Sequence, residues 1–126
     1  MLVGKWFGET DIAGVGKQKW IVERYPNGTY QTHYRVFTED GHIKDTVEAG
    51  HWGVSGLVYF SVNRATRPID GRFRDTDPAD PKFYDAYEVI ELTNHVFRYK
   101  HAETSDQFEM KKVDDDFELP RRSDFN

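Results

Sequence analysis

Alternating hydrophobic and polar positions recur along most of the chain and predict β-strands. The last such stretch, residues 84–113, contains three strand-like runs joined by short polar turns, which is the pattern of an antiparallel meander. A meander leaves an apolar face and hydrogen-bonding edges open, so it needs further strands beside it. The upstream chain supplies them, because the same pattern predicts strands at residues 2–10, 18–25, 29–37, 42–49, 50–54 and 57–63.

The connections between these runs indicate tight reversals of the chain. Asn27-Gly28 follows Pro26, and an Asn-Gly pair accepts the positive φ angles of a tight hairpin, so we expect a positive φ at Gly28. Strand-like runs with short connections, and no segment that indicates a helix, predict an all-β fold. We expect an up-and-down antiparallel β-barrel of about eight or nine strands, in which closure removes the open edges. A two-sheet sandwich is the alternative.

Residues 64–85 interrupt this rhythm. The segment mixes proline, aspartate and arginine without the period of a strand or a helix, and so predicts a long loop. Phe73, Phe83 and Tyr84 are large aromatic residues within it. We expect at least one of them to cover the open mouth of the barrel as a lid, in contact with inward-facing side chains such as that of Trp20 or Tyr34.

Length and composition narrow the classes of protein. We expect one domain over residues 1–126, with a short C-terminal tail anchored by Phe117 and Leu119. The net charge of −5, with basic residues scattered among acids, argues against a nucleic-acid partner. No run approaches the ~20 apolar residues of a membrane helix, so we expect no transmembrane segment. Without cysteine there is neither a disulfide nor a thiolate metal site.

The compartment stays open at this level. No signal peptide is recognisable, yet a mature exported domain stripped of its leader would give the same pattern. A periplasmic or exported location and a cytoplasmic location are therefore both compatible with the sequence, and the oligomeric state is not indicated.

The chain contains several short motifs that are typical of one family. They are Gly4-Lys5-Trp6 on the first strand, the turn Asn27-Gly28-Thr29-Tyr30, the step Gly50-His51-Trp52-Gly53 and the terminal meander. Together they resemble the small bacterial lipocalin-like (calycin) β-barrel domains over nearly the whole chain. The resemblance implies that Trp6 caps the closed end of the barrel and packs under a basic residue near the last strand. Lys112, Arg121 and Arg122 are the candidates for that basic residue.

The inward faces of such a barrel either form a packed core or bound a ligand pocket. The mixture of Tyr, Trp and Arg on alternating positions favours a pocket, because the polar tips of these side chains need partners when they are buried. The candidate ligand-binding residues, drawn from the strands and from the long loop, are Trp20, Arg24, Tyr34, Phe60, Phe73, Phe83, Tyr84 and Tyr99.

Motifs for catalysis, metals and cofactors are weak. A buried set of Arg, Glu and His could hold a carboxylate or do acid–base chemistry, but Gln31, His33 and Arg35 form a polar row typical of a solvent-facing position. The five histidines lack metal-ligand spacing, and the aspartates of residues 75–80 lack the spacing of a calcium loop. We therefore name no catalytic residue and expect neither metal nor cofactor.

The sequence favours a non-enzymatic protein that binds a small hydrophobic or amphipathic molecule in a barrel cavity. Two alternatives stay open. One is an interaction or envelope-associated protein whose barrel is packed solid, and the other is a barrel enzyme of isomerase or decarboxylase type. An empty interior favours the first and third interpretations, whereas a filled interior favours the second.

Overall fold

The computed structural model describes residues 2–121, and these residues form an almost purely β structure. The strands are β1 (Gly4–Ile12), β2 (Gly16–Arg24), β3 (Thr29–Thr38), β4 (Ile43–Ser55), β5 (Val58–Pro68), β6 (Arg74–Asp75), β7 (Tyr84–Leu92), β8 (Val96–His101) and β9 (Gln107–Lys112). A three-residue 3-10 turn, η1 (Pro81–Phe83), precedes β7. Across residues 2–121 no helix is long and apolar enough to cross a membrane.

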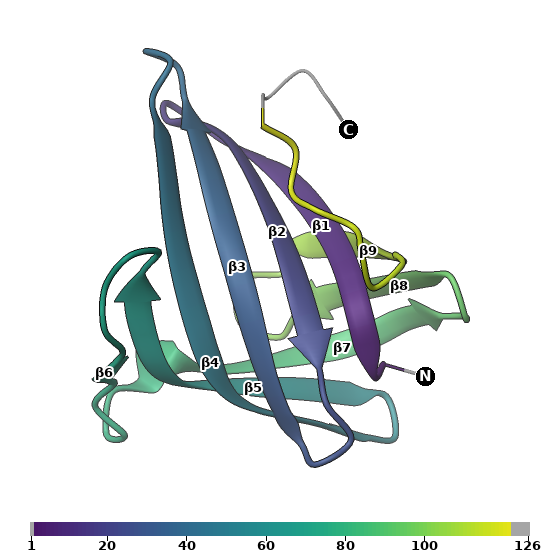
Figure 1. The fold of residues 1–126 in the computed structure, drawn as a ribbon. Coiled ribbons are helices and arrows are strands. Elements are labelled where there is room, and N and C mark those ends of the chain that lie inside the picture. The colour runs from purple at the N-terminus through teal and green to yellow at the C-terminus, as the bar shows by residue number, and fades with distance from the viewer. Residues whose placement is uncertain (1, 122–126) are drawn as a thin grey trace.

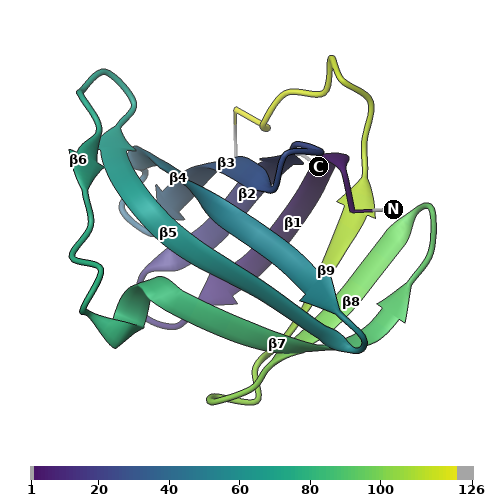
Figure 2. The same cartoon turned by 90° about the horizontal axis from the view of Figure 1, so that it is seen from below.

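Eight of the strands close into an antiparallel barrel. Strands β1 to β5 each pair with the next strand in the chain. Strand β5 also pairs with β7, β7 with β8, and β8 with β9. The pairing of β9 with β1 closes the ring. The short strand β6 adds to the free edge of β5, outside the closed ring (Figure 1). Seen from below, the strands surround one common interior (Figure 2). The predicted all-β, up-and-down barrel is confirmed, and the sandwich alternative is wrong.

The hairpin between β2 and β3 has the predicted geometry. Gly28 has a φ of 85° and its N–H donates to the carbonyl of Tyr25 at 3.1 Å. The side-chain oxygen of Asn27 accepts the N–H of Thr29 at 3.0 Å, which closes the turn locally. The prediction of a positive φ at Gly28 is confirmed.

The fourth and fifth predicted strands are one continuous strand. Residues 42–49 and 50–54 were expected to be separate, but β4 runs through both segments with a register shift between Ala49 and Gly50. A Cβ atom at Gly50 would lie 1.9 Å from the carbonyl oxygen of Val62 on β5. Gly50 is therefore where a bulge brings two backbones close, and the glycine that resembled a strand end marks a bend within the strand.

The predicted loop 64–85 is too long at both ends. Residues 64–68 continue β5, because their backbone pairs with β4 up to Pro68, and residues 84–85 already belong to β7. The charged side chains of residues 64–68 hide the strand pattern in the sequence, because only one face of the strand is buried there. The true connection covers residues 69–83 and contains both β6 and η1.

Hydrogen bonds hold this connection along β5. The N–H of Thr76 donates to the carbonyl of Arg64 at 2.9 Å, and its hydroxyl donates to the carbonyl of Asn63 at 2.7 Å. The hydroxyl of Tyr84 donates to the carbonyl of Pro78 at 2.6 Å and accepts a bond from Arg64 at 3.3 Å. These hydrogen bonds hold the segment against β5. Its last turn, η1, contributes residues to the lining of the barrel cavity.

The closed end of the barrel has the arrangement that the resemblance implied. Trp6 is fully buried, and its ring N–H donates to the carbonyl of Leu2 at 3.1 Å. The Lys112 ammonium lies 5.5 Å from the centre of the Trp6 ring and donates to the carbonyl of Val3 at 2.7 Å. Lys112 is therefore the basic residue that packs on Trp6. Arg121 lies instead beside the outer face of β2 and β3, and Arg122 falls outside the described residues.

The tail packs against the outside of the barrel. Leu119 is buried in a small cluster with Phe7 and Ile21, and the Phe117 ring lies 5.2 Å from the Phe7 ring. Arg35 on β3 also donates to the carbonyl of Pro120 at 3.1 Å. The expected anchoring of the tail by Phe117 and Leu119 is confirmed.

Candidate functional site

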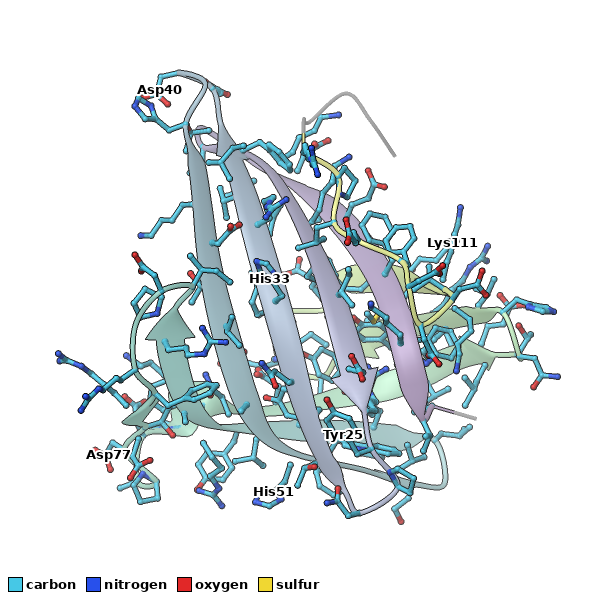
Figure 3. The ribbon with its side chains drawn as sticks, viewed as in Figure 1. Tyr25, His33, Asp40, His51, Asp77 and Lys111 are labelled. Carbon is cyan, nitrogen blue, oxygen red and sulfur yellow. The ribbon has the colours of Figure 1, made fainter. Side chains whose placement is uncertain are left out.

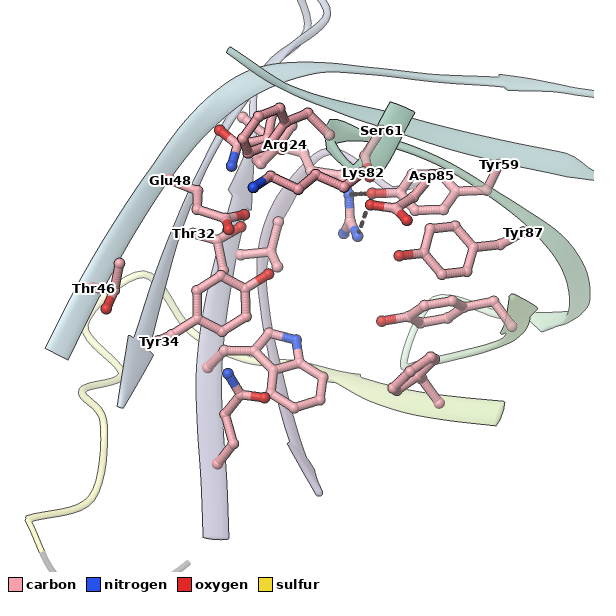
Figure 4. Close-up of a pocket in the computed structure, with 18 of the residues that line it drawn as sticks. Arg24, Thr32, Tyr34, Thr46, Glu48, Tyr59, Ser61, Lys82, Asp85 and Tyr87 are labelled. Carbon is pink, nitrogen blue, oxygen red and sulfur yellow. Dashed lines mark hydrogen bonds between the residues drawn. The ribbon is translucent and has the colours of Figure 1, made fainter. Parts of the chain in front are cut away.

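The barrel interior contains a cavity of about 560 Å³ that is partly open to solvent. Its walls come from the inward-facing positions of seven strands and from the end of the long connection. Figure 4 shows side chains that line it. The lining residues are Gln18, Trp20, Val22, Arg24, Tyr30, Thr32, Tyr34, Val36, Thr46, Glu48, Tyr59, Ser61, Asn63, Lys82, Phe83, Asp85, Tyr87, Tyr99 and Phe108.

Strand alternation explains this list. On β2 and β3 the lining consists of every second residue, from Gln18 to Arg24 and from Tyr30 to Val36. The two strands are paired so that Trp20 faces Tyr34 across the ladder. Their rings lie 6.2 Å apart, so one register sets both the wall and its aromatic contacts.

One side of the cavity is an aromatic wall. The Tyr87 ring lies 5.0 Å from Tyr99 and 5.5 Å from Tyr59, while Tyr99 stacks on Phe108 at 5.4 Å. These rings support one another through edge and face contacts, which fixes their orientation. The wall is made of apolar ring surfaces in stacked and edge-on contact, and it carries three phenol hydroxyls.

Gly8 on β1 leaves room for the ring of Trp20, which also lines the cavity. A Cβ atom at Gly8 would lie 2.6 Å from the Trp20 ring, to which Gly8 is paired across the β1–β2 ladder. The indole therefore lies flat over β1, where any side chain at position 8 would displace it. This is a position where absence of a side chain shapes the cavity.

A buried arginine lies deep in the cavity. Arg24 is 2% exposed, and its Nε and Nη2 atoms donate to the hydroxyl of Tyr59 at 3.1 and 3.0 Å. The guanidinium packs over the Tyr59 ring at 5.0 Å and the Phe97 ring at 5.7 Å. Figure 4 shows Arg24 and Tyr59 joined by these bonds at the edge of the cavity. Its remaining nitrogen, Nη1, is buried without a hydrogen-bond partner.

Two carboxyl groups face the same space from other strands. Burial raises the pKa of Glu48 on β4, and the nearby charge of Asp85 raises it further, whereas a hydrogen bond from Tyr34 opposes the shift. Asp85 on β7 lies 2.8 Å from Nε2 of His101. The site therefore has one carboxyl that favours protonation and one that is paired.

His101 is held in a single tautomer. Its Nδ1 accepts the backbone N–H groups of Glu103 at 3.1 Å and Thr104 at 3.2 Å. Since Nδ1 is an acceptor, a neutral ring carries its proton on Nε2 and donates it to Asp85. This fixes the position of the Asp85 carboxylate at the cavity wall.

The phenol hydroxyls stay protonated at neutral pH. Burial raises the pKa of Tyr30, Tyr34, Tyr87 and Tyr99 above their ordinary value, and neighbouring acids or phenols add to the shift. For Tyr30 and Tyr99 the charge of Arg24 opposes it. A ligand would therefore meet neutral hydroxyl groups that both donate and accept hydrogen bonds.

Residues of the long connection complete the lining. Lys82 and Phe83, from η1, border the cavity together, with the Lys82 ammonium 5.0 Å from the Phe83 ring centre. Lys82 is largely exposed and lies 3.7 Å from Asp80, whose carboxylate accepts the Lys82 N–H. Phe83 therefore borders the cavity, and its role as a lid in contact with Trp20 or Tyr34 stays a prediction.

Five of the eight sequence-predicted site residues line this cavity, namely Trp20, Arg24, Tyr34, Phe83 and Tyr99. Phe60 does not line it, because Tyr59 and Ser61 point inward on β5 and Phe60 packs outside, against Gly53. Phe73 and Tyr84 also lie outside the lining. Phe73 is 45% exposed under Arg67 at 5.0 Å, and Tyr84 is 43% exposed on the outer side of β7.

Sequence reasoning missed the acidic and phenolic residues of β4, β5 and β7. Glu48, Tyr59, Asp85 and Tyr87 all line the cavity. For Asp85 and Tyr87, alternation along β7 gave the signal, but the inward face of that strand was not assigned. For Glu48 the signal was also present, because it shares the inward face of β4 with Thr46 and Trp52, but the inward face of that strand was not assigned.

The polar row of β3 lies on the outer face, as its composition indicated. Arg35 donates to both carboxylate oxygens of Asp45, at 2.8 and 3.2 Å, and His33 lies 3.5 Å from the same carboxylate. Figure 3 shows His33 on the outside of the sheet. Among the described residues, no group of three or more acidic or histidine side chains could hold a metal ion.

Solved structures of similar shape place the fold in a known class. A lipocalin-like protein from Bacteroides uniformis ATCC 8492 matches with a TM-score of 0.51 and 17% identity, over 89% of this chain and 98% of that protein. An uncharacterized protein from Bacteroides eggerthii DSM 20697 matches with a TM-score of 0.50 and 12% identity, over 90% and 100%. No protein-family model and no curated protein matches the sequence. At these identities the likeness concerns the fold alone, and the chain has a lipocalin-like β-barrel fold.

Proposed function

We propose that this protein binds one small amphipathic molecule inside the barrel. The observation that carries the proposal is the cavity of about 560 Å³, which combines an aromatic wall with a few inward polar groups. Ligand sites in proteins are typically concave, of roughly 300–1,000 Å³, mostly apolar and furnished with a few placed polar groups. The cavity agrees in volume and in its aromatic surface, and its lining is more polar than that of a typical site, since nine of the nineteen lining residues are polar or charged apart from the tyrosines.

The lining indicates the chemical character of such a molecule. Trp20, Tyr87, Tyr99 and Phe108 offer ring faces for an apolar or aromatic body. The phenol hydroxyls and the Arg24 side chain offer hydrogen bonds at the deep end. A purely hydrophobic ligand would leave these polar groups without partners, which costs free energy, so an amphipathic one fits better.

The same cavity argues against the interpretation of a solidly packed interaction protein. Side chains fill the closed end around Trp6 and Phe97, both fully buried, but they do not fill the space between Arg24 and Phe83. A barrel whose function lay only in its outer surface would gain stability by filling this space with larger side chains.

The proposal is tested by closing the cavity. Ser61 is a small inward residue on β5, so Ser61→Trp should place an indole in the cavity, while Glu88→Trp adds the same group to the exposed face of β7. Binding of the neutral dye Nile red should be saturable in the parent protein and in Glu88→Trp, and strongly reduced in Ser61→Trp. Equal binding by both variants, with unchanged circular dichroism, would refute a site inside the barrel.

A second candidate function, a barrel enzyme of isomerase or decarboxylase type, is favoured by Glu48. A carboxyl group whose pKa is raised inside a cavity is a frequent general acid or base. Incubation with a panel of unsaturated acids and β-keto acids, followed by NMR, would test it. Turnover by the parent protein that Glu48→Gln abolishes would support an enzyme, whereas no turnover of any member would favour binding alone.

A further inference from the structure

The buried charge of Arg24 has no carboxylate partner at ion-pair distance in the described part of the chain. Across residues 2–121 no carboxylate oxygen lies within 4.0 Å of its guanidinium, although five contacts of that length join other Lys or Arg side chains to a carboxylate. Arginine keeps its charge when buried, and an uncompensated buried charge is costly. Tyr59, the Met110 sulfur at 3.8 Å and two aromatic rings surround it, and none of these carries a negative charge.

From this arrangement we propose that the cavity selects an amphipathic monoanion, in particular a small carboxylic acid, whose negative group binds at Arg24 and Tyr59. The proposal rests on the proposed function and specifies its ligand class. The apolar body of the acid would extend from there along other aromatic residues of the lining, such as Trp20 and Phe108.

The Tyr59 hydroxyl is prepared to donate to such an anion. It accepts two bonds from Arg24, at 3.1 and 3.0 Å, and its own hydrogen has no acceptor among the described residues. Bonds accepted from a cation polarise the O–H group and make it a stronger donor. A carboxylate oxygen that accepts this hydrogen would lie beside the guanidinium, where its charge would compensate the charge of Arg24.

The remaining charges of the cavity favour an acid with one negative charge. Glu48 and Asp85 also line the space, so a second negative charge would meet repulsion at short range. A cationic ligand would instead have to share the cavity with Arg24, while Asp85 is already paired with His101 at 2.8 Å. Lys82 contributes little to the choice, because it is largely exposed and has Asp80 beside it.

Three compounds with the same tail separate these cases: octanoate, octanol and octylamine. Their affinities for the full chain can be measured by isothermal titration calorimetry at neutral pH. We expect octanoate to bind roughly tenfold or more tightly than octanol, because a charge-assisted hydrogen bond to a buried group is worth at least that factor. Octylamine should bind more weakly than octanol.

Matched variants assign the preference to Arg24. Arg24→Met keeps an unbranched, flexible side chain and removes the charge, so the preference for octanoate over octanol should disappear. Arg98→Met makes the same exchange on the outer face, where Arg98 pairs with Glu91 and Glu109, and should keep the preference. Tyr59→Phe should weaken octanoate binding and leave octanol binding unchanged.

The outcomes distinguish this inference from the proposed function. If octanol and octanoate bind the parent protein equally, or octylamine binds best, the anion site is refuted while a cavity for small molecules stands. If none of the three compounds and no Nile red binds, the proposed function itself fails. Should Arg24→Met not fold, the comparison of the three compounds on the parent protein still decides the matter, because it needs no variant.

Discussion

Replacement of Trp6 by alanine tests whether the closed end of the barrel is built as described. Trp6 is fully buried, contacts Phe97 edge-on at 6.4 Å and donates to the carbonyl of Leu2 at 3.1 Å. Removal of a large aromatic side chain from a core costs about 3–5 kcal/mol. Its contact with the Lys112 ammonium, at a largely exposed position, adds about 0.5–1 kcal/mol. Trp6→Ala should therefore lower the free energy of unfolding by about 3.5–6 kcal/mol.

That loss is a large part of the roughly 5–15 kcal/mol that stabilises a typical domain. With a urea dependence of about 2 kcal/mol per molar, the unfolding midpoint should fall by about 2 M, which tryptophan fluorescence or circular dichroism can follow. Leu57→Ala is the control, because Leu57 is 70% exposed and its loss should cost less than about 0.5 kcal/mol. A loss below about 1 kcal/mol for Trp6→Ala would refute the placement of Trp6 as the cap of the barrel.

Three further predictions follow from the strands and the cavity. Folding raises the pKa of Glu48, so its ionisation destabilises the protein as pH rises above the ordinary pKa of 4.5. Glu48→Gln should therefore raise the urea midpoint of unfolding at neutral pH and leave it unchanged below about pH 4. Unchanged midpoints at both pH values would contradict that burial. Gly50→Ala should cost about 1–3 kcal/mol, since its Cβ would meet the Val62 carbonyl at 1.9 Å; a neutral effect in thermal unfolding would argue against the bulge. Gly28→Val should cost at least about 1–2 kcal/mol at a φ of 85°, and wild-type stability would contradict that turn.

The sequence allowed the architecture to be predicted because alternation and turn chemistry are local signals. The Asn27-Gly28 turn and the strands β2 and β3 follow from residues that are neighbours in the chain. The boundaries that failed depend on distant residues. Whether 64–68 is strand or loop is decided by its pairing with β4, and charged residues tolerate either state when one face is solvated.

The candidate site was predicted in part for the same reason. Alternation grouped Trp20 with Arg24, but it cannot say which of two opposite faces of a strand points inward. On β5, Phe60 was chosen as a candidate ligand-binding residue, whereas Tyr59 faces the cavity and Phe60 packs outside against Gly53. That no carboxylate lies within ion-pair distance of Arg24 also cannot be read from the sequence, because it depends on where the other strands place Glu48 and Asp85 in the cavity.

An NMR titration of the isotope-labelled protein with octanoate would show directly whether a ligand binds inside the barrel. We expect saturable shifts, with one-to-one stoichiometry, of the side-chain signals of Arg24, Tyr59 and Tyr99 inside the barrel. The ring signals of His33, on the outer face of β3, should not move. Shifts confined to outward-facing residues, or no saturable shift at any inward residue, would contradict a ligand site within the barrel.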